Sequence, residues 1–254
     1  MKVVSVFSIK HPDGLSFRKY LVSVAKPLSD IPLRVSEEGF LVRGLSPDKS
    51  VLAEVFMPPG VFEEYNVSGV NDLTIERDEL LKILKRLGKG DSLLLKYEEG
   101  GGKVRAMLVN SRSGIERGYD VRVASLEGPI DPIQVELPIS MRVETSIVQR
   151  LLKDAKLVGE ELTITYSGDA VEFLSSSEGG EFRTVLERGK QLLELTSETK
   201  ERVSSTYDID LLKTATVALS AFDVALICFG PSLPLKISLT GEDGVGVTLW
   251  IASR

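Results

Sequence analysis

The residues of this sequence that could do chemistry are clustered cations. Lys82, Lys85, Arg86 and Lys89 recur at the spacing of one helix face. Such a face can contact phosphate groups without reading a base sequence, and the contact weakens as salt rises. A surface helix can also carry lysines only for solubility, so the spacing by itself leaves both interpretations open.

Further cations follow the same pattern on other expected helices. The expected helices cover residues 17–26, 78–87, 146–158 and 208–216. Cations dominate the outer face of the first three, whereas the fourth offers Lys213 against Asp208 and Asp210. The candidate phosphate-binding residues are Arg18, Lys19, Lys26, Lys82, Lys85, Arg86, Lys89, Arg150, Lys153, Lys156 and Lys213.

The second helix has the clearest boundaries. We expect Asp78 to cap its N-terminus and Gly88 to take the left-handed position after its last turn. Leucines at positions 80, 81, 84 and 87 form its apolar stripe.

The residues of common catalytic and metal sites are missing. Cys228 is the only cysteine and lies in the apolar run 224–229, so we expect a buried free thiol. His11 is the only histidine and precedes a Pro-Asp-Gly turn, where we expect a solvated residue. The glycines of 99–103 lie between two expected strands, as in a hairpin loop rather than a phosphate-binding loop. We therefore expect no enzymatic activity, no metal and no cofactor.

Composition limits the class of protein. The 254 residues include 43% hydrophobic and 27% charged side chains, the balance of a soluble globular protein. The formal net charge is −6, so any contact with nucleic acid must be local. No segment approaches the roughly 20 apolar residues of a membrane span, and the N-terminus lacks a signal-peptide core. We expect a cytosolic protein, or a nuclear one if the cell has a nucleus.

The two halves of the chain resemble each other weakly at a constant offset of about half its length. The matched segments are 25–28 with 155–158, 38–42 with 169–173, and 78–82 with 209–213. Each half reads strand, helix, several strands, helix and more strands, with strands expected at 51–56, 93–97, 162–166 and 235–239. The sequence therefore predicts an α+β fold of two similar tandem domains.

A proline-rich stretch separates the two halves. Three prolines between residues 126 and 138 rule out a helix there and predict an extended surface connector. We place an N-terminal domain at 1–125, the connector at 126–138 and a C-terminal domain at 139–254. Open sheet edges of such strand-rich domains could pair head to tail between subunits and close a ring.

Several of these segments resemble one protein family, in the same order along the chain. The segment 38–52, the motif Phe62-Glu-Glu-Tyr65, the helix segment 81–85, the motif Leu233-Pro-Leu-Lys236 and the ending 249–254 resemble the sliding DNA clamps, the proliferating cell nuclear antigen family. The Trp-Ile-Ala ending and Val158-Gly-Glu-Glu161 look most like archaeal members, for which a cytoplasmic, nucleoid-associated location is expected.

The resemblance implies a processivity factor: a closed ring of three subunits with helices around duplex DNA and sheets outside. It implies that the clamp loader, DNA polymerase, flap endonuclease and DNA ligase bind the ring, and that enzymes insert a short helical turn into a hydrophobic pocket beneath the connector. Carried over by position, that pocket comprises Leu45, Lys49, Leu52, Leu126, Ile130, Ile133, Pro234, Trp250, Ile251 and Ala252. The implied subunit contact pairs the strand around 118–123 with that around 182–187, through Tyr119, Val121, Val123, Phe182, Thr184 and Leu186.

Two positions depart from the family pattern. Lys49 stands where many members have histidine, and Ser253 stands where most have proline, which we expect to loosen the chain end. The alternative function is a peptide-binding scaffold that does not contact DNA. Whether the ring is a homotrimer or a heterotrimer with paralogues stays open.

Overall fold

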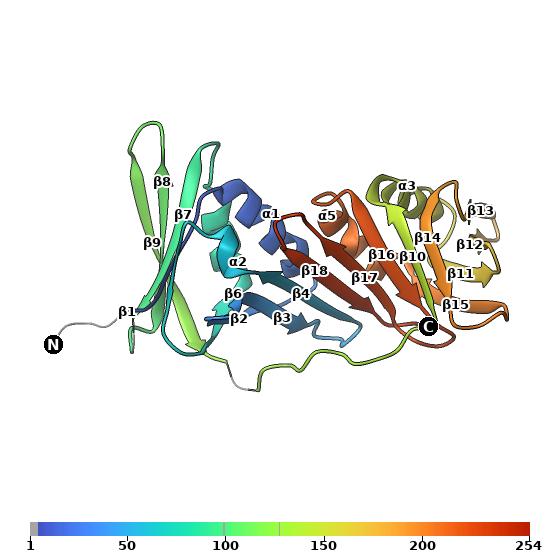
Figure 1. Cartoon of the computed structure of the whole chain (residues 1–254), viewed down its shortest axis with the longest axis horizontal. Helices are drawn as coiled ribbons and strands as arrows, with labels where there is room; N and C mark the ends of the chain where they lie inside the picture. Colours follow the sequence, from blue (N-terminus) through green and yellow to red (C-terminus); the bar gives the residue numbers. More distant parts are fainter. Residues whose placement is uncertain (1–4, 99, 127) are drawn as a thin grey trace. The chain divides into compact units, whose positions relative to one another are not determined.

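The computed structural model describes residues 5–98, 100–126 and 128–254 (Figure 1). Glu99, which belongs to an expected turn, and Glu127, in the expected connector, lie outside the described residues. The chain divides into two compact units, which are treated separately below. Unit 1 comprises residues 1–47, 53–131 and 241–247, and unit 2 comprises 48–52, 132–240 and 248–254.

Unit 1 is built on antiparallel strands in the order β4-β3-β2-β6-β9-β8-β7-β1-β5. The strands are β1 (Ser5–His11), β2 (Asp30–Ser36), β3 (Gly39–Leu45), β4 (Val51–Met57), β5 (Glu64–Val67), β6 (Asn71–Glu76), β7 (Asp91–Glu98), β8 (Lys103–Asn110) and β9 (Glu116–Ser125). The helices are α1 (Gly14–Ala25), the short η1 (Pro59–Val61) and α2 (Arg77–Leu84).

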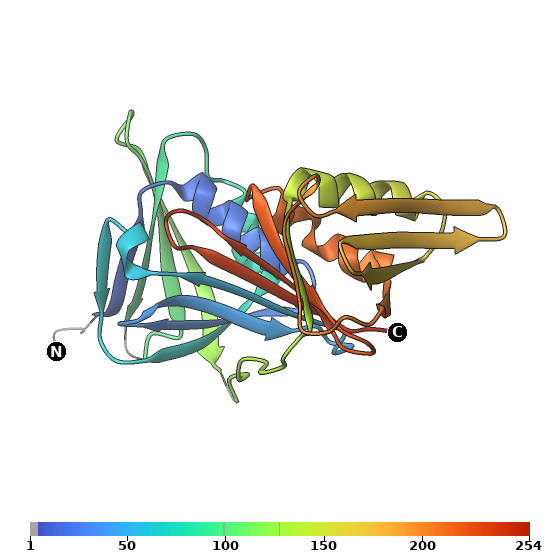
Figure 2. The ribbon, with the colours of Figure 1, turned by 45° about the vertical axis from the view of Figure 1, so that its right-hand side comes forward.

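Unit 2 contains two sheets, β14-β10-β16-β17-β18 and β13-β12-β11-β15. Its strands are β10 (Ile139–Glu144), β11 (Glu161–Ser167), β12 (Ala170–Ser177), β13 (Gly180–Glu187), β14 (Leu192–Ser197), β15 (Val203–Asp208), β16 (Val224–Phe229), β17 (Leu235–Thr240) and β18 (Gly246–Ile251). Its helices are α3 (Thr145–Lys156), α4 (Ile209–Leu212), η2 (Lys213–Ala215) and α5 (Thr216–Leu219). Figure 2 shows α3 running alongside the β12–β13 hairpin.

The predicted α+β repeat is confirmed in its order of elements. Both halves run strand, helix, strands, helix, strands, and all four strands expected by position are present as β4, β7, β11 and β17. The three matched sequence pairs fall on the ends of α1 and α3, on β3 and β12, and on α2 and α4. The short sequence matches between the two halves therefore fall on elements that occupy the same place in the order of each half.

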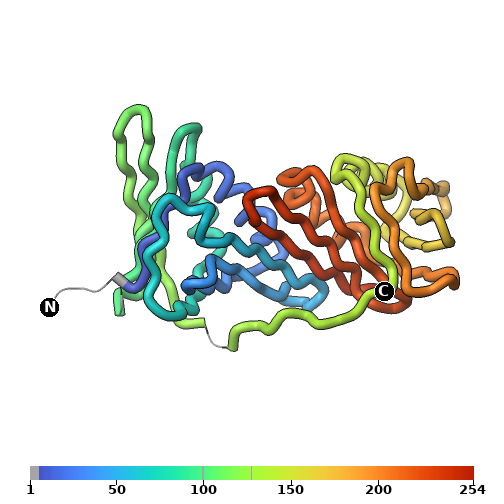
Figure 3. The backbone as a smooth tube through the Cα atoms, viewed as in Figure 1, coloured from blue at the N-terminus to red at the C-terminus, as the bar shows by residue number. Residues whose placement is uncertain are grey.

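The stretch between β9 and β10 has neither helix nor strand in residues 128–138 (Figure 3). Most of its side chains are exposed, including Val135 at 40%. Proline cannot donate a backbone hydrogen bond and disfavours a helical conformation in the residue before it. These two properties account for the lack of helix and strand in residues 128–138.

The core of unit 1 explains why β1 and α1 form. Phe7, Ile9 and His11 alternate inward along β1, and α1 buries Phe17 and Leu21 against the sheet. The ring centroids of Phe17 and Phe40 are 5.3 Å apart, and the two rings pack edge to face. This alternation makes His11 part of the core.

The expectation that His11 is solvated is therefore wrong. His11 is 6% exposed and lies between Phe17 and Phe62, with ring centroids 5.7 and 5.6 Å away. Its Nδ1 accepts a hydrogen bond from the Asp13 backbone N–H at 3.2 Å. Burial lowers the pKa of the imidazole, and the neighbouring Asp13 only partly offsets this.

This burial makes stability depend on pH. Because the folded-state pKa of His11 lies below the unfolded value of about 6.5, the unfolded chain binds more protons below that pH. We expect the free energy of unfolding to fall as pH drops below about 6.5, by up to about 1.4 kcal/mol for each unit by which the pKa is lowered. Urea titrations between pH 8 and 5 measure this slope.

The His11→Phe variant is the control, because it removes the only histidine while filling the same aromatic site. Its stability should change less over this pH range. An unchanged slope would assign the pH dependence to other groups.

Two helix predictions need correction. The α2 helix is capped by Glu76, whose side chain accepts the Asp78 N–H at 3.2 Å, and not by Asp78. It ends at Leu84, and the left-handed glycine that follows is Gly90, with φ +82°, rather than Gly88. The carboxylate of Asp91 accepts the Gly88 N–H at 2.8 Å and thereby holds this turn.

The expected fourth helix is also interrupted. Residues 209–219 form the three short pieces α4, η2 and α5 in place of one helix. Thr214 donates its hydroxyl hydrogen to the carbonyl of Leu211, and threonine and valine have low helix propensity.

Two further expectations about unit 2 are wrong. Cys228 is partly exposed, because the alternation of β16 buries Ala225, Ile227 and Phe229 instead. The chain end is held in place: Ser253 bridges to Tyr207, and the Arg254 N–H donates to the carbonyl of Thr206 at 2.9 Å. Among the described helices, none is long and apolar enough to cross a membrane.

Candidate nucleic-acid and protein interfaces

Seven of the candidate cations belong to unit 1 and lie on or next to α1 and α2. Lys19 and Lys26 are exposed on and just after α1, and Lys82 is exposed on α2. Lys85 and Arg86 continue α2 through a hydrogen-bonded turn, whereas Lys89 lies in the following loop. Within the described parts of the chain, none of the seven forms an ion pair. Their charge is available to an external anion.

The four candidate cations of unit 2 are less available. Arg150 and Lys153 are exposed on α3, and Lys213 is half-buried on η2. The ammonium of Lys156 is 2.8 Å from the carboxylate of Asp210 on α4. That hydrogen bond raises the pKa of Lys156 and occupies its charge. The structure thus separates Lys156 from the other ten candidates.

This ion pair yields a prediction about anion binding. Replacing Asp210 by asparagine removes the partner of Lys156, so we expect tighter duplex-DNA binding at low salt, by a few-fold. The plot of log affinity against log salt concentration should steepen by about 0.9, the value for one additional phosphate contact. Fluorescence anisotropy over a salt series measures both quantities.

The matched control is Asp169→Asn, which changes the net charge equally. Asp169 is 90% exposed and pairs with Arg188, which is outside the candidate set. Equal effects of the two variants would show that only net charge matters.

The predicted pocket residues fall into both units. Leu45, Leu126 and Ile130 belong to unit 1, and the other seven to unit 2. In unit 1, the side chain of Leu45 is 37% exposed. The Leu126 N–H donates to the carbonyl of Asp72 at 3.1 Å, and the carbonyl of Ile130 accepts a hydrogen bond from Arg43 Nη1 at 3.1 Å.

In unit 2, the predicted pocket residues range from core to surface. Ile251 is fully buried and Trp250 is 6% exposed, with the Lys236 ammonium 5.1 Å from its ring centroid. The Ala252 N–H donates to the carbonyl of Ser50 at 2.9 Å, while the Ala252 side chain is exposed. Lys49 is exposed and adopts a left-handed conformation with φ +61°, which is uncommon for a residue other than glycine.

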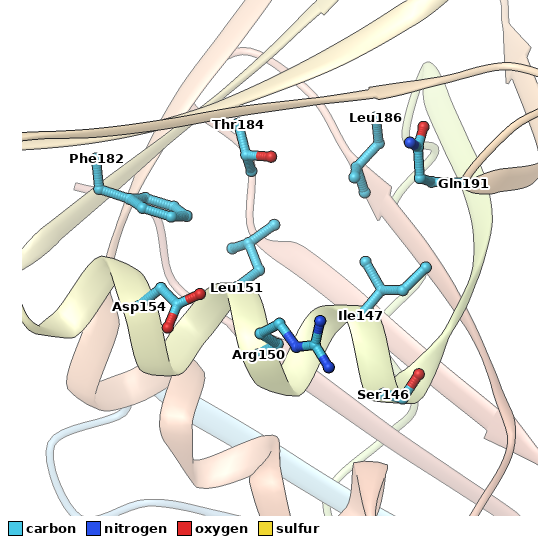
Figure 4. A pocket seen from close by; sticks show the side chains of 9 residues that line it. All are labelled: Ser146, Ile147, Arg150, Leu151, Asp154, Phe182, Thr184, Leu186 and Gln191. Atoms are coloured by element: carbon cyan, nitrogen blue, oxygen red, sulfur yellow. The ribbon is translucent and has the colours of Figure 1, made fainter.

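A cavity of about 260 Å³ lies between α3 and β13 in unit 2 (Figure 4). Three predicted interface residues, Phe182, Thr184 and Leu186, point into it from β13. Sequence reasoning missed the α3 side of this cavity. That side is formed by Ser146, Ile147, Arg150, Leu151 and Asp154, and Gln191 completes the lining. Two sequence patterns could have indicated this cavity: the alternation along β13, which places residues 182, 184 and 186 on one face, and the helical spacing of Ile147 and Leu151 on α3.

β13 is an edge strand. In the described chain it pairs with β12 along its whole length and forms the end of its sheet. Its even-numbered residues face α3, whereas Arg183 and Val185 lie on the opposite face. An unpaired strand edge beside an apolar cavity is suited to binding another strand.

The other predicted interface strand, β9, is open along its first part. It pairs with β8 over Glu116–Arg122 and with β6 only over Val123–Ser125. The edge of β9 that faces β6 therefore has no strand partner among the described residues over 116–122. Tyr119 and Val123 are half-buried and Val121 is buried. Arg117, on the same face, donates to the carbonyl of Arg86 at 3.0 Å, so this face lies next to the end of α2.

Asp91 connects the turn after α2 to the strands β8 and β9. Its side chain is 2% exposed, accepts Asn110 Nδ2 at 2.7 Å and forms an ion pair with Arg117. The hydrogen bonds from Asn110 and Gly88, together with Arg117, lower the pKa of the carboxyl despite its burial. Among the described residues, no cluster of three or more His, Cys, Asp or Glu is arranged to hold a metal ion.

Comparison with known proteins gives a consistent set of relatives. No family model matches the sequence. DNA polymerase sliding clamp 1 of Saccharolobus solfataricus is 25% identical over 253 residues, covering 98% of this chain and 100% of the relative. A DNA polymerase sliding clamp of Methanococcus maripaludis is 28% identical over 232 residues, covering 87% and 88%.

Solved structures share the fold. PCNA from Thermococcus kodakaraensis aligns with a TM-score of 0.86 at 22% identity and covers 98% of this chain and 100% of its own. A chain of the PCNA2–PCNA3 complex from Sulfolobus tokodaii aligns with a TM-score of 0.86 at 21% identity, covering 97% and 99%. The fold is therefore that of PCNA over the whole chain.

Proposed function

We propose that this chain, which belongs to the sliding-clamp family by its full-length match to archaeal relatives and by its fold, encircles duplex DNA and tethers DNA polymerase to it. The observation that carries the proposal is the match along 98% of this chain and 100% of a relative named DNA polymerase sliding clamp 1. The role is non-catalytic: the chain supplies position and binding surface, and its partners supply the chemistry.

The charge distribution supports contact with a DNA backbone. A net charge of −6 coexists with seven unpaired candidate cations on and beside α1 and α2. Lysine and arginine on helix surfaces contact phosphates without reading bases, and loose contacts of this kind permit sliding. Unit 2 contributes Arg150, Lys153 and Lys213, with Lys156 held by Asp210.

The open strand edges support assembly into a ring. Pairing β9 of one subunit with β13 of the next satisfies both edges in a head-to-tail contact, which closes if the rotation between subunits permits. The cavity between α3 and β13 then receives apolar side chains of the neighbour. We propose a three-subunit ring, formed with copies of this chain or with paralogues.

Partner enzymes are proposed to bind through the predicted hydrophobic pocket. Two apolar residues of the predicted pocket are exposed, Leu45 in unit 1 and Ala252 in unit 2. A short helical turn with apolar anchors is the ligand that suits such a surface. Flap endonuclease, DNA ligase and the clamp loader are proposed partners of the same kind as DNA polymerase.

Retention on closed DNA tests the function. The protein is loaded onto a nicked circular plasmid with a clamp loader and passed through a sizing column in high salt, before or after the plasmid is cut once. We expect retention on the circle and loss from the linear ends. Protein that is not retained on circles but still binds apolar peptides would be a scaffold without DNA contact.

A further inference from the structure

Arg43 connects the unit 1 sheet to the segment that leaves it after β9. Its Nε forms an ion pair with Glu54 on the neighbouring strand β4, and its Nη1 donates to the carbonyl of Ile130 at 3.1 Å. The two side chains of the ion pair are only 18% and 24% exposed. One guanidinium therefore joins two strands to a segment that has no secondary structure of its own.

A second contact fixes the start of the same segment. The Leu126 N–H donates to the carbonyl of Asp72 at 3.1 Å, and the Asp72 carboxylate is held by Arg34 through contacts of 2.7 and 2.9 Å. Leu41, Leu126, Pro129 and Ile130 line a small hollow between these two contacts. Leu126 and Ile130 are thus each held to unit 1 by a hydrogen bond.

Arg43 makes the last of these contacts. Beyond Ile130, the described residues 131–137 form no hydrogen bond, and Asp131, Pro132 and Val135 are exposed. The hydrogen bond to Ile130 therefore decides where the fixed part of the connector ends.

We propose that Arg43 is a positioning residue for partner binding: its forked guanidinium fixes the connector at Ile130 so that Ile130 and Ile133 meet a partner peptide in place. The proposal rests on the proposed tethering function. If the connector backbone is already fixed, peptide binding does not cost the conformational entropy of ordering it. The peptide therefore binds more tightly.

The chemistry requires arginine rather than any cation. The planar guanidinium offers donors in two directions, so Nε serves Glu54 while Nη1 serves the carbonyl of Ile130. A lysine ammonium at the same position can keep the ion pair with Glu54 but has no rigid second arm to reach Ile130. Arg43→Lys and Arg43→Met should therefore behave alike in peptide binding.

The test uses the protein in four forms: unaltered, Arg43→Lys, Arg43→Met and Arg142→Met. Arg142→Met is the matched control because it breaks an arginine–carboxylate pair between the adjacent strands β10 and β14 and touches neither connector contact. Hydrogen–deuterium exchange of residues 128–135 is followed for each form. Affinity is measured for a fluorescein-labelled peptide that carries one helical turn of aliphatic and aromatic side chains. The unfolding temperature confirms that each form is folded.

We expect both Arg43 variants to exchange faster at 128–135 and to bind the peptide about tenfold more weakly, a loss equivalent to about 1.4 kcal/mol. Arg142→Met should change the affinity by less than about twofold. Equal peptide affinity in all four forms, an Arg43→Lys variant that binds like the unaltered protein, or unchanged exchange at 128–135 would overturn the role of Arg43. If the unaltered protein does not bind the peptide, the result contradicts the proposed tethering pocket itself. Equal binding by all four forms contradicts only the role of Arg43.

Discussion

Replacing Phe182 by aspartate should dissociate the assembled protein into single chains. Phe182 projects from the edge strand β13 into the cavity beside α3, where a neighbour's apolar side chains are proposed to bind. A carboxylate there has to be desolvated, a cost that Arg150 in the cavity lining offsets only in part, and losses at the centre of an interface are commonly above 2 kcal/mol. We expect the dissociation constant between subunits to rise at least about 100-fold. Native mass spectrometry across a concentration series measures it.

Val185→Asp is the matched control on the same strand. Val185 is 40% exposed and lies on the face of β13 opposite Phe182, away from the cavity. It introduces the same charge, so a ring-sized mass should persist. Because Phe182 is half-buried in the single chain, circular dichroism must show that Phe182→Asp is folded. A folded Phe182→Asp protein of unchanged mass would exclude the cavity from the subunit contact.

Removing the Asp91 carboxylate should produce the largest loss of stability among the substitutions considered. Asp91→Ala leaves the Gly88 N–H and the Asn110 amide without their acceptor, and it deprives Arg117 of its ion pair. Arg117 is 36% exposed and can be solvated, so we expect a loss of about 2–4 kcal/mol rather than the full cost of breaking a buried pair. Urea unfolding at pH 7 measures the change.

The pH dependence gives an independent check on the same carboxylate. The folded-state pKa of Asp91 is lowered, so its contribution is present above the unfolded pKa of about 3.9 and is lost as pH falls through the folded value. The difference between the unaltered protein and Asp91→Ala should therefore shrink in acid. Asp120→Ala is the control, because its ion pair with Lys103 is exposed on both sides and is screened by solvent, so its loss should cost much less stability. A loss for Asp91→Ala no larger than that of Asp120→Ala would refute the structural role.

Elements with strong periodicity were predictable from the sequence. The apolar stripe of α3 and the alternation of β11 and β17 each depend on residues close in the chain, and all three formed as expected. The boundaries of α2 were not predictable, because the turn after Leu87 is set by Asp91 and Asn110, which lie in the later strands β7 and β8. The capping pattern around Asp78 was a plausible but incorrect alternative.

Burial of single residues was harder to predict than the elements themselves. His11 looked like part of a polar turn, but the period of β1 carries it inward with Phe7 and Ile9. Cys228 lies in an apolar run, yet the same period turns it outward opposite Lys236 of β17. In both cases the strand alternation outweighed the local composition.

The candidate site was predictable only where its members share an element. The cation spacing of α1, α2 and α3 follows from the helix period, and β13 places its even-numbered residues together. The pairing of Lys156 with Asp210 and the reach of Arg43 to Ile130 join residues far apart in the chain. No local pattern in the sequence contains either contact.

The open edge of β13 has a consequence for the chain before it assembles. An exposed strand edge can pair with strands of unrelated chains and start aggregation. Along this edge strand, Glu181, Arg183 and Glu187 are exposed and alternate with the residues that face the cavity. Charges in these positions resist pairing with an arbitrary apolar strand while leaving the cavity side available. These charges therefore make a single chain less prone to aggregate through the edge of β13.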